Sequence, residues 1–178
     1  VRILEPKKER GTATLKANED LFSYLSKTGR TVKITGAMMG GSWMGSHFTN
    51  DDLVKSTRLR DEFKATVSEG PTVEGSPTYK LVLIPNPDTV VVWGQIDITV
   101  RKSDLLPVDQ LFYDEDGAPA RKMEFREYRQ IGERATATRI TMTPLDKPNE
   151  FTEIRYAKLE FDVGLDENYF TLQRLKSM

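Results

Sequence analysis

The sequence contains no cysteine and only one histidine, His47. The absence of cysteine excludes disulfide bonds, thiolate catalysis and most zinc sites. A single histidine also excludes a histidine-rich metal site and an acid–base pair of two histidines within one chain. Proteins of either redox environment can lack cysteine, so its absence does not decide the compartment.

Long apolar runs and an excess of one charge are missing as well. No stretch approaches the ~18 consecutive apolar residues of a membrane-spanning helix. The 26 Lys and Arg residues nearly balance the 27 Asp and Glu residues. We therefore expect no nucleic-acid partner, because there is no net basic field to attract one. At 178 residues, of which 38% are hydrophobic, the chain fits one folded domain with a sizeable core.

The pattern that dominates the sequence is alternation of apolar and polar residues, which is typical of strands with one buried face. The run Asp114-Glu115-Asp116-Gly117 is a strong hairpin turn, and Asn18-Glu19-Asp20 is another turn. About nine or ten closely spaced strands predict a mainly β fold, either a strongly curved antiparallel sheet or a partly closed barrel. Strands are predicted at residues 11–17, 21–25, 32–34, 59–67, 79–84, 90–100, 108–113, 121–130, 135–143 and 152–161.

Three local features refine this prediction. Residues 59–67 are rich in Glu and Lys, as a charged helix would be, but their regular alternation favours a strand. In residues 152–161 the apolar face switches sides, which predicts a bulge near Ala157. One helix start is convincing: Thr49 caps it, with Asp52 in the reciprocal position three residues later. Helix is expected to be a minor component.

The residues available for catalysis are few. A Ser-His-Asp triad would have to use His47, whose neighbours Ser42, Ser46 and Asp51 are close in sequence rather than brought together by folding. A loop histidine that makes hydrogen bonds is the better interpretation. We expect no enzyme activity, no metal and no cofactor.

Charged clusters are interpreted as solvated surface. The carboxylate pairs Asp51-Asp52 and Asp61-Glu62 lie at a predicted helix start and on a polar strand face, so neither faces a partner across a cleft. Residues 121–130 interleave basic side chains, Arg121 among them, with glutamates and two aromatic residues. We interpret this stretch as a solvated strand face of mixed charge rather than a platform for nucleic acid.

The most unusual segment is residues 36–48, which contains four glycines. It has neither the lysine motif of a phosphate-binding loop nor the glycine spacing of a dinucleotide-binding loop. Large apolar side chains on this glycine-rich backbone suit a variable apolar ligand or partner. The alternative is that the segment folds back and plugs one end of the core, and composition leaves the two interpretations equal. The candidate ligand-binding residues are Met38, Met39, Trp43, Met44 and Phe48.

Residues 41–53, which read Gly-Ser-Trp-Met-Gly-Ser-His-Phe-Thr-Asn-Asp-Asp-Leu, closely resemble a signature of LolA-like outer-membrane lipoprotein-sorting proteins. In that family a Gly-Ser-aromatic-Met-Gly-Ser block leads to Phe-Ser/Thr-x-x-Asp-Leu. The preceding hairpin with its Tyr24-Leu25 pair and the ending at residues 165–175 are similar to the family as well. The resemblance spans nearly the whole chain.

The resemblance implies a half-open antiparallel barrel with helices over its apolar concavity, and residues 1–178 as a single LolA-like domain. Relative to the family, we expect the N-terminal helix and first strands to be missing. It also implies a periplasmic location, with a signal peptide removed or outside this sequence.

The function implied is that of a non-catalytic periplasmic carrier, which binds lipoprotein acyl chains or other lipid in transit to the outer membrane. Transport proteins of the inner or outer membrane are its expected partners. The alternative is a lipid-sensing or protein-interaction module associated with a membrane exporter or signalling complex, with the Met-rich segment as contact surface.

Overall fold

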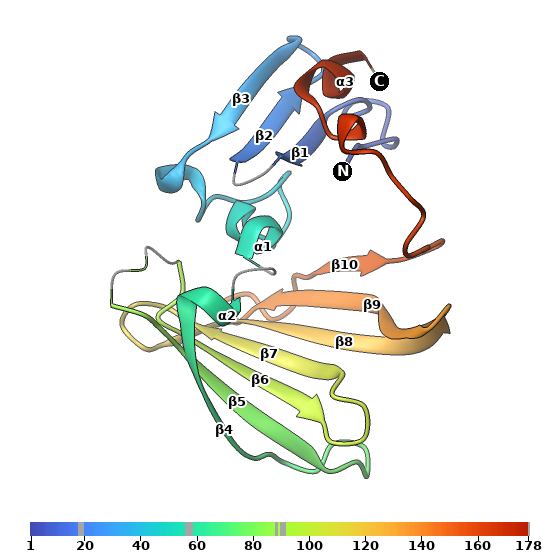
Figure 1. The fold of residues 1–178 in the computed structure, drawn as a ribbon. Helices are drawn as coiled ribbons and strands as arrows, with labels where there is room; N and C mark the ends of the chain where they lie inside the picture. Colours follow the sequence, from blue (N-terminus) through green and yellow to red (C-terminus); the bar gives the residue numbers. More distant parts are fainter. Residues whose placement is uncertain (18–19, 56–58, 88, 90–91, 178) are drawn as a thin grey trace. The chain divides into compact units, whose positions relative to one another are not determined.

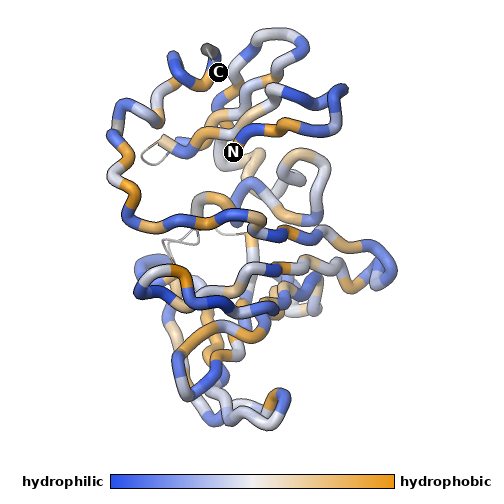
Figure 2. The backbone as a smooth tube through the Cα atoms, turned by 90° about the vertical axis from the view of Figure 1, so that its right-hand side faces the viewer, coloured by the Kyte–Doolittle hydropathy of each residue, from blue (hydrophilic) through white to orange (hydrophobic). Residues whose placement is uncertain are grey.

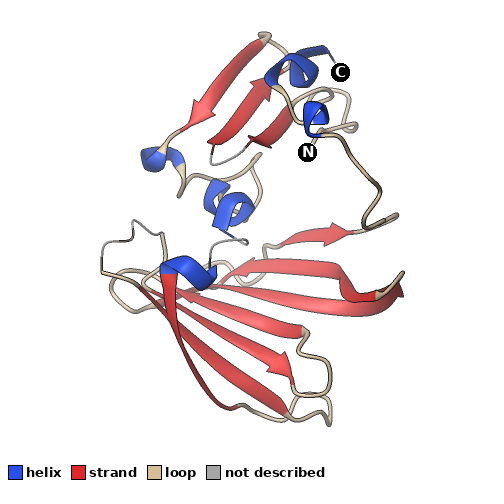
Figure 3. Ribbon diagram, in the orientation of Figure 1, coloured by secondary structure: helices blue, strands red, loops and turns tan. Residues whose placement is uncertain are grey.

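The computed structural model describes residues 1–17, 20–55, 59–87, 89 and 92–177. The prediction of a mainly β fold is confirmed: across these ranges, ten strands are joined by a few short helices (Figure 3). The chain separates into two compact units. The smaller unit comprises Val1–Gly41, Thr49–Ser56 and Asp162–Met178, and the larger unit comprises Ser42–Phe48 and Thr57–Phe161.

The smaller unit is built on an antiparallel sheet of β1 (Ala13–Ala17), β2 (Asp20–Leu25) and β3 (Arg30–Ile34). This confirms the predicted strands, although residues 18–19 of the first predicted turn lie outside the described part of the chain. Leu175 of the C-terminal helix packs on the apolar side chains of β1. The helices of this unit are η1 (Gly36–Met38), α1 (Asn50–Lys55), η2 (Glu167–Tyr169) and α3 (Leu172–Ser177).

Helix α1 begins where the sequence predicts it. The Thr49 backbone N–H donates to the Asp52 carboxylate at 2.7 Å, and the Asp52 N–H donates to the Thr49 hydroxyl at 3.4 Å. These reciprocal bonds satisfy two N–H groups that a helix start would otherwise leave without a partner. A second small core forms nearby, where Met39 and Leu53 pack against Leu21 and Ile34.

The larger unit contains a seven-stranded antiparallel sheet in the order β10-β9-β8-β7-β6-β5-β4 (Figure 1). Since β4 and β10 end this order, the sheet stays open. Within the described ranges, no helix has the length and apolar character needed to cross a membrane. The strands are β4 (Phe63–Glu69), β5 (Thr78–Pro85), β6 (Gln95–Arg101), β7 (Pro107–Tyr113), β8 (Pro119–Ile131), β9 (Arg134–Pro144) and β10 (Thr152–Arg155).

The register of the larger sheet gathers its apolar side chains on one side, which we call the apolar face. Leu83 pairs with Ile96, and Ile96 pairs in turn with Phe112. Further along, Met123 pairs with Met142. Because side chains alternate along a strand, each such row puts its polar neighbours on the other side. Figure 2 shows this alternation of hydrophobic and hydrophilic positions along the chain.

The opposite face carries charged and polar groups. The Asp97 carboxylate forms a salt bridge with the Lys80 ammonium at 2.8 Å and accepts a hydrogen bond from the Tyr113 hydroxyl at 3.2 Å. The bond to Asp97 raises the pKa of Lys80, and burial raises the pKa of Tyr113. These contacts give the polar side chains of this face hydrogen-bond partners within the protein.

The predicted strand at residues 59–67 is wrong in its first half. Leu59–Glu62 forms the short helix α2, and β4 begins only at Phe63. Phe63 pairs with Pro85, the last residue of β5. Beyond this point β5 offers no partner, so Leu59 turns into a helix and its side chain packs on the core of the larger unit.

Two further predicted strands are shorter than expected. In the predicted strand at residues 90–100 the observed strand β6 begins at Gln95, and residues 90–91 lie outside the described part of the chain. The strand predicted at residues 152–161 ends at Arg155, so the bulge near Ala157 is wrong. The side switch of its apolar residues marks the point where the strand ends and an irregular segment begins.

Candidate functional site

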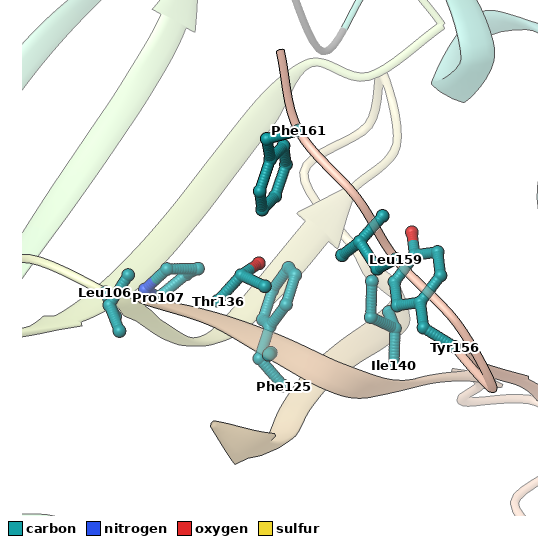
Figure 4. A pocket seen from close by; sticks show the side chains of 9 residues that line it. Leu106, Pro107, Phe125, Thr136, Ile140, Tyr156, Leu159 and Phe161 are labelled. Carbon is teal, nitrogen blue, oxygen red and sulfur yellow. The ribbon is translucent and has the colours of Figure 1, made fainter. Parts of the chain in front are cut away.

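The larger unit contains an apolar pocket of about 210 Å³ over β8 and β9, from the middle of these strands toward their hairpin turn (Figure 4). Its lining residues are almost all apolar or aromatic. Only Thr136 and Tyr156 bring a polar side-chain group, in each case a hydroxyl. The pocket is lined by Leu106, Pro107, Phe125, Thr136, Ala137, Ile140, Tyr156, Leu159 and Phe161.

The floor of the pocket is a direct product of strand register. Phe125 on β8 and Ile140 on β9 are cross-strand partners, so their side chains lie next to each other on the apolar face. Thr136, four residues before Ile140 on the same strand, projects from the same side. Leu106 and Pro107 complete one wall at the start of β7.

The roof of the pocket is the chain that follows β10, residues 156–161, which we call the 156–161 segment. Leu159 and Phe161 direct their side chains toward the floor, and the Tyr156 side chain lies beside Ile140 and Leu159 (Figure 4). The Tyr156 N–H donates to the Thr138 carbonyl at 3.0 Å, and no other backbone–backbone hydrogen bond from this segment is found among the described residues. Side-chain contacts therefore hold most of the segment in place.

Tyr128 contacts two pocket-lining residues through their backbone carbonyls. Its hydroxyl donates to the Pro107 carbonyl and lies 3.1 Å from the Phe125 carbonyl. The Arg101 guanidinium lies 3.9 Å from the centre of its ring. Burial raises the pKa of Tyr128, so its hydroxyl keeps its proton and can donate to these carbonyls. The two carbonyls belong to pocket-lining residues, and their positions are fixed by this contact.

At the other end of the apolar face the space is filled by aromatic side chains. Phe48 is 5% exposed and belongs to the core of the larger unit, and Trp43 and Trp93 pack against that core. The Trp43 N–H donates to the Phe48 carbonyl at 2.8 Å. Trp43 and Phe48 therefore lie where the second interpretation of residues 36–48 expects them, folded back on the core.

His47 links the loop of residues 42–48 to β10 through its side chain and to β8 through its carbonyl. Its Nδ1 lies 2.9 Å from the Thr152 hydroxyl and its Nε2 lies 3.5 Å from the Glu150 carboxylate. The Ser42 and Ser46 hydroxyls donate to backbone carbonyls instead, at 2.5 and 2.7 Å. These contacts agree with the interpretation of His47 as a hydrogen-bonding loop residue.

Arg121 was expected on a solvated strand face, and that prediction is wrong. The residue is 4% exposed. Its guanidinium lies 4.2 Å from the Trp93 ring and 4.3 Å from the Phe112 ring, and it donates to the His47 carbonyl at 3.2 Å. Aromatic faces and a carbonyl attract the cation inside the core, and the side chain thereby anchors the loop.

The five candidate residues divide between the two units. Met38 and Met39 belong to the smaller unit, where Met39 packs in a core and Met38 is 40% exposed. Trp43, Met44 and Phe48 belong to the larger unit. Met44 is half-buried and has a φ of 52°, next to Gly45 at 73°. The structure brings Trp43 and Phe48 together, and the ligand contact of all five residues stays a prediction.

The residues of the pocket were not identified from the sequence. Strand alternation could place Phe125 and Ile140 on one face, but nothing in it showed that this stretch of the face is hollow. The signal for the roof was the side switch between Ile154 and Leu159, which was interpreted as a bulge. In the residues that the structure describes, no group of three or more His, Cys, Asp or Glu side chains could hold a metal ion.

Comparisons with known proteins agree with this architecture. A family model described as "Uncharacterized protein" matches residues 1–177. A search of curated protein sequences found no match to the chain. The chain is similar to a solved domain from Vibrio parahaemolyticus, named provisionally as an outer membrane lipoprotein-sorting protein domain, with 25% identity and a TM-score of 0.86; the match covers 98% of this chain and 75% of that one.

Two further solved structures show the same fold. A DUF1329 family protein from Desulfovibrio piger is 24% identical with a TM-score of 0.90, over 98% of this chain and 75% of that chain. A LolA superfamily protein from Nitrosomonas europaea is 20% identical with a TM-score of 0.78, over 97% of this chain and 75% of that chain. The predicted resemblance to LolA-like proteins is confirmed.

Proposed function

Because the chain belongs to the family whose model spans residues 1–177 and has the LolA-like fold, we propose that it is a non-catalytic carrier of the bacterial periplasm. Its cargo is an acyl chain, of a lipoprotein or of another lipid, in transit to the outer membrane. The observation that carries this proposal is the apolar pocket, whose lining offers two hydroxyls and no charged side chain.

The size of the pocket limits what it takes. An apolar cavity of about 150 Å³ holds a molecule such as benzene, and drug-sized ligands need about 300–1,000 Å³. At about 210 Å³ the pocket fits part of one acyl chain rather than a whole lipid. Each methylene that leaves water for the pocket contributes about 0.8 kcal/mol, so a few carbons are enough for reversible binding.

Native mass spectrometry of protein purified from a lipid-containing host tests this proposal, followed by titration of delipidated protein with a fluorescent fatty acid. Leu159→Glu places a charge in the pocket and is expected to abolish binding. Leu105→Glu is the matched control, because Leu105 is 64% exposed and does not line the pocket. Failure of the unaltered protein to take up any acyl probe would contradict the carrier function.

A second candidate function is a protein-interaction module that works beside transport proteins of either membrane. It is favoured by exposed apolar side chains near the C-terminus, where Val163, Leu165 and Phe170 are 55%, 56% and 46% exposed. Residues of this kind on a surface are typical of contact sites. A partner captured by delipidated protein, and lost on Leu165→Ser without loss of acyl binding, would support it.

A further inference from the structure

The pocket has one wall that differs from the others in how it is held. Phe161 is the last residue of the larger unit and closes the pocket from above, with its ring directed toward Phe125 and Thr136 (Figure 4). The floor residues are fixed by strand pairing, whereas no backbone–backbone hydrogen bond of Phe161 itself is found in the described part of the chain. The position of this ring therefore depends on its side-chain contacts.

One of these contacts involves a cation. The Arg134 guanidinium, at the start of β9, lies 5.1 Å from the centre of the Phe161 ring. A cation at this distance is attracted to the face of an aromatic ring. The contact gives the ring a preferred position over the pocket although its side chain is only half-buried.

We propose that Phe161 is the residue that determines how many carbons of an acyl chain enter the pocket. This inference rests on the proposed carrier function. With Phe161 in place, the space of about 210 Å³ takes the methyl end of a single chain, on the order of six to eight carbons. Carbons beyond that number remain outside the pocket, together with the polar end of the ligand, since no charged side chain lines the interior.

Calorimetric titration of delipidated protein with octanoate, laurate and palmitate tests the role of Phe161. For the unaltered protein, octanoate fills the pocket and longer chains gain little further affinity. Phe161→Ala removes the ring and opens space for several more methylenes, each worth about fourfold in affinity. We therefore expect the ratio of laurate to octanoate affinity to rise about tenfold or more in this variant.

Two companion variants keep the experiment decisive. Phe151→Ala is the matched control, because Phe151 is 60% exposed and is not part of the pocket lining, so its affinity ratio should equal that of the unaltered protein. Phe161→Trp adds bulk instead and should weaken octanoate binding about fourfold or more. If circular dichroism shows that Phe161→Ala is unfolded, the Trp variant decides alone.

The outcomes separate the two proposals. Acyl binding with the same chain-length profile in the unaltered protein and in both Phe161 variants would overturn the role of Phe161 and leave the carrier function standing. Absence of binding in the unaltered protein would overturn both. A shift in opposite directions for the Ala and Trp variants, with Phe151→Ala unchanged, would support the assignment of Phe161.

Discussion

The two ends of the apolar face in the larger unit are covered in opposite ways. At one end Trp43, Phe48 and Trp93 complete a packed core, and the loop that carries Phe48 is tied by backbone and side-chain hydrogen bonds. At the other end the 156–161 segment leaves a cavity and holds on mainly through Leu159 and Phe161. The same kind of sheet surface therefore serves stability at one end and leaves a cavity, the proposed ligand site, at the other.

The largest expected effect comes from opening the packed end. Phe48→Ala removes a 5% exposed aromatic side chain from the core, which should lower the free energy of unfolding by about 3–5 kcal/mol. Urea denaturation measures this change. Phe151→Ala, at a 60% exposed position, should stay within about 0.5 kcal/mol. Equal losses for the two variants would break the comparison.

Removal of the Arg121 guanidinium, which anchors the loop at the packed end, is expected to cost less unfolding free energy than removal of the Phe48 ring. Arg121→Met keeps most of the stem but removes the cation that contacts Trp93, Phe112 and the His47 carbonyl. Loss of these contacts, partly offset by relief of charge burial, should cost about 2 kcal/mol of unfolding free energy in the same urea measurement. Arg129→Met, on an exposed residue, is the control. A neutral result for Arg121→Met would show that the loop does not depend on this contact.

Truncation of a side chain at the pocket end of the apolar face should change the free energy of unfolding only weakly. Leu159 is half-buried over a space that is already open, so Leu159→Ala leaves no new closed cavity and should cost only about 1 kcal/mol. Its affinity for a fluorescent fatty acid should fall several-fold at the same time. A loss of stability as large as that of Phe48→Ala would mean that the 156–161 segment belongs to the folding core.

The smallest effect is electrostatic and concerns the strand that leads into this segment. Glu153 accepts hydrogen bonds from Arg155 and Arg139, which lower its pKa below the ordinary value of 4.5. A carboxylate with a depressed folded-state pKa stabilises the fold above its unfolded pKa and loses this contribution as the pH falls through the folded-state pKa. Glu153→Gln should therefore be slightly less stable than the unaltered protein near neutral pH, and equally stable in acid. Thermal unfolding across pH measures this, and a pH-independent difference would contradict it.

Local signals in the sequence predicted local structure well. The reciprocal pair Thr49 and Asp52 located α1, and Asp114 to Gly117 forms the expected turn, with Gly117 at a φ of 80°. Both features depend on residues a few positions apart, for which side-chain chemistry is sufficient.

What the sequence did not predict depends on distant partners. Leu59 alternates like a strand residue but is helical because its would-be partner strand has already ended at Pro85. Arg121 is buried because two aromatic rings from other segments meet around it. The pocket depends on how far the 156–161 segment lies from β8 and β9. The spacing of residues along the sequence does not determine this separation.

The open order of the larger sheet has a consequence for contacts between molecules. Strand β4 pairs with β5 on one side, and within the described sheet its other side carries a row of backbone groups without a strand partner. After Phe63 every residue of β4 is exposed, and Val67 is 59% exposed. Such an edge is a template for pairing with another chain, and charges such as Lys64 and Glu69 near its ends limit this pairing. Self-association at high protein concentration is therefore expected to begin at β4, away from the pocket residues on β8 and β9.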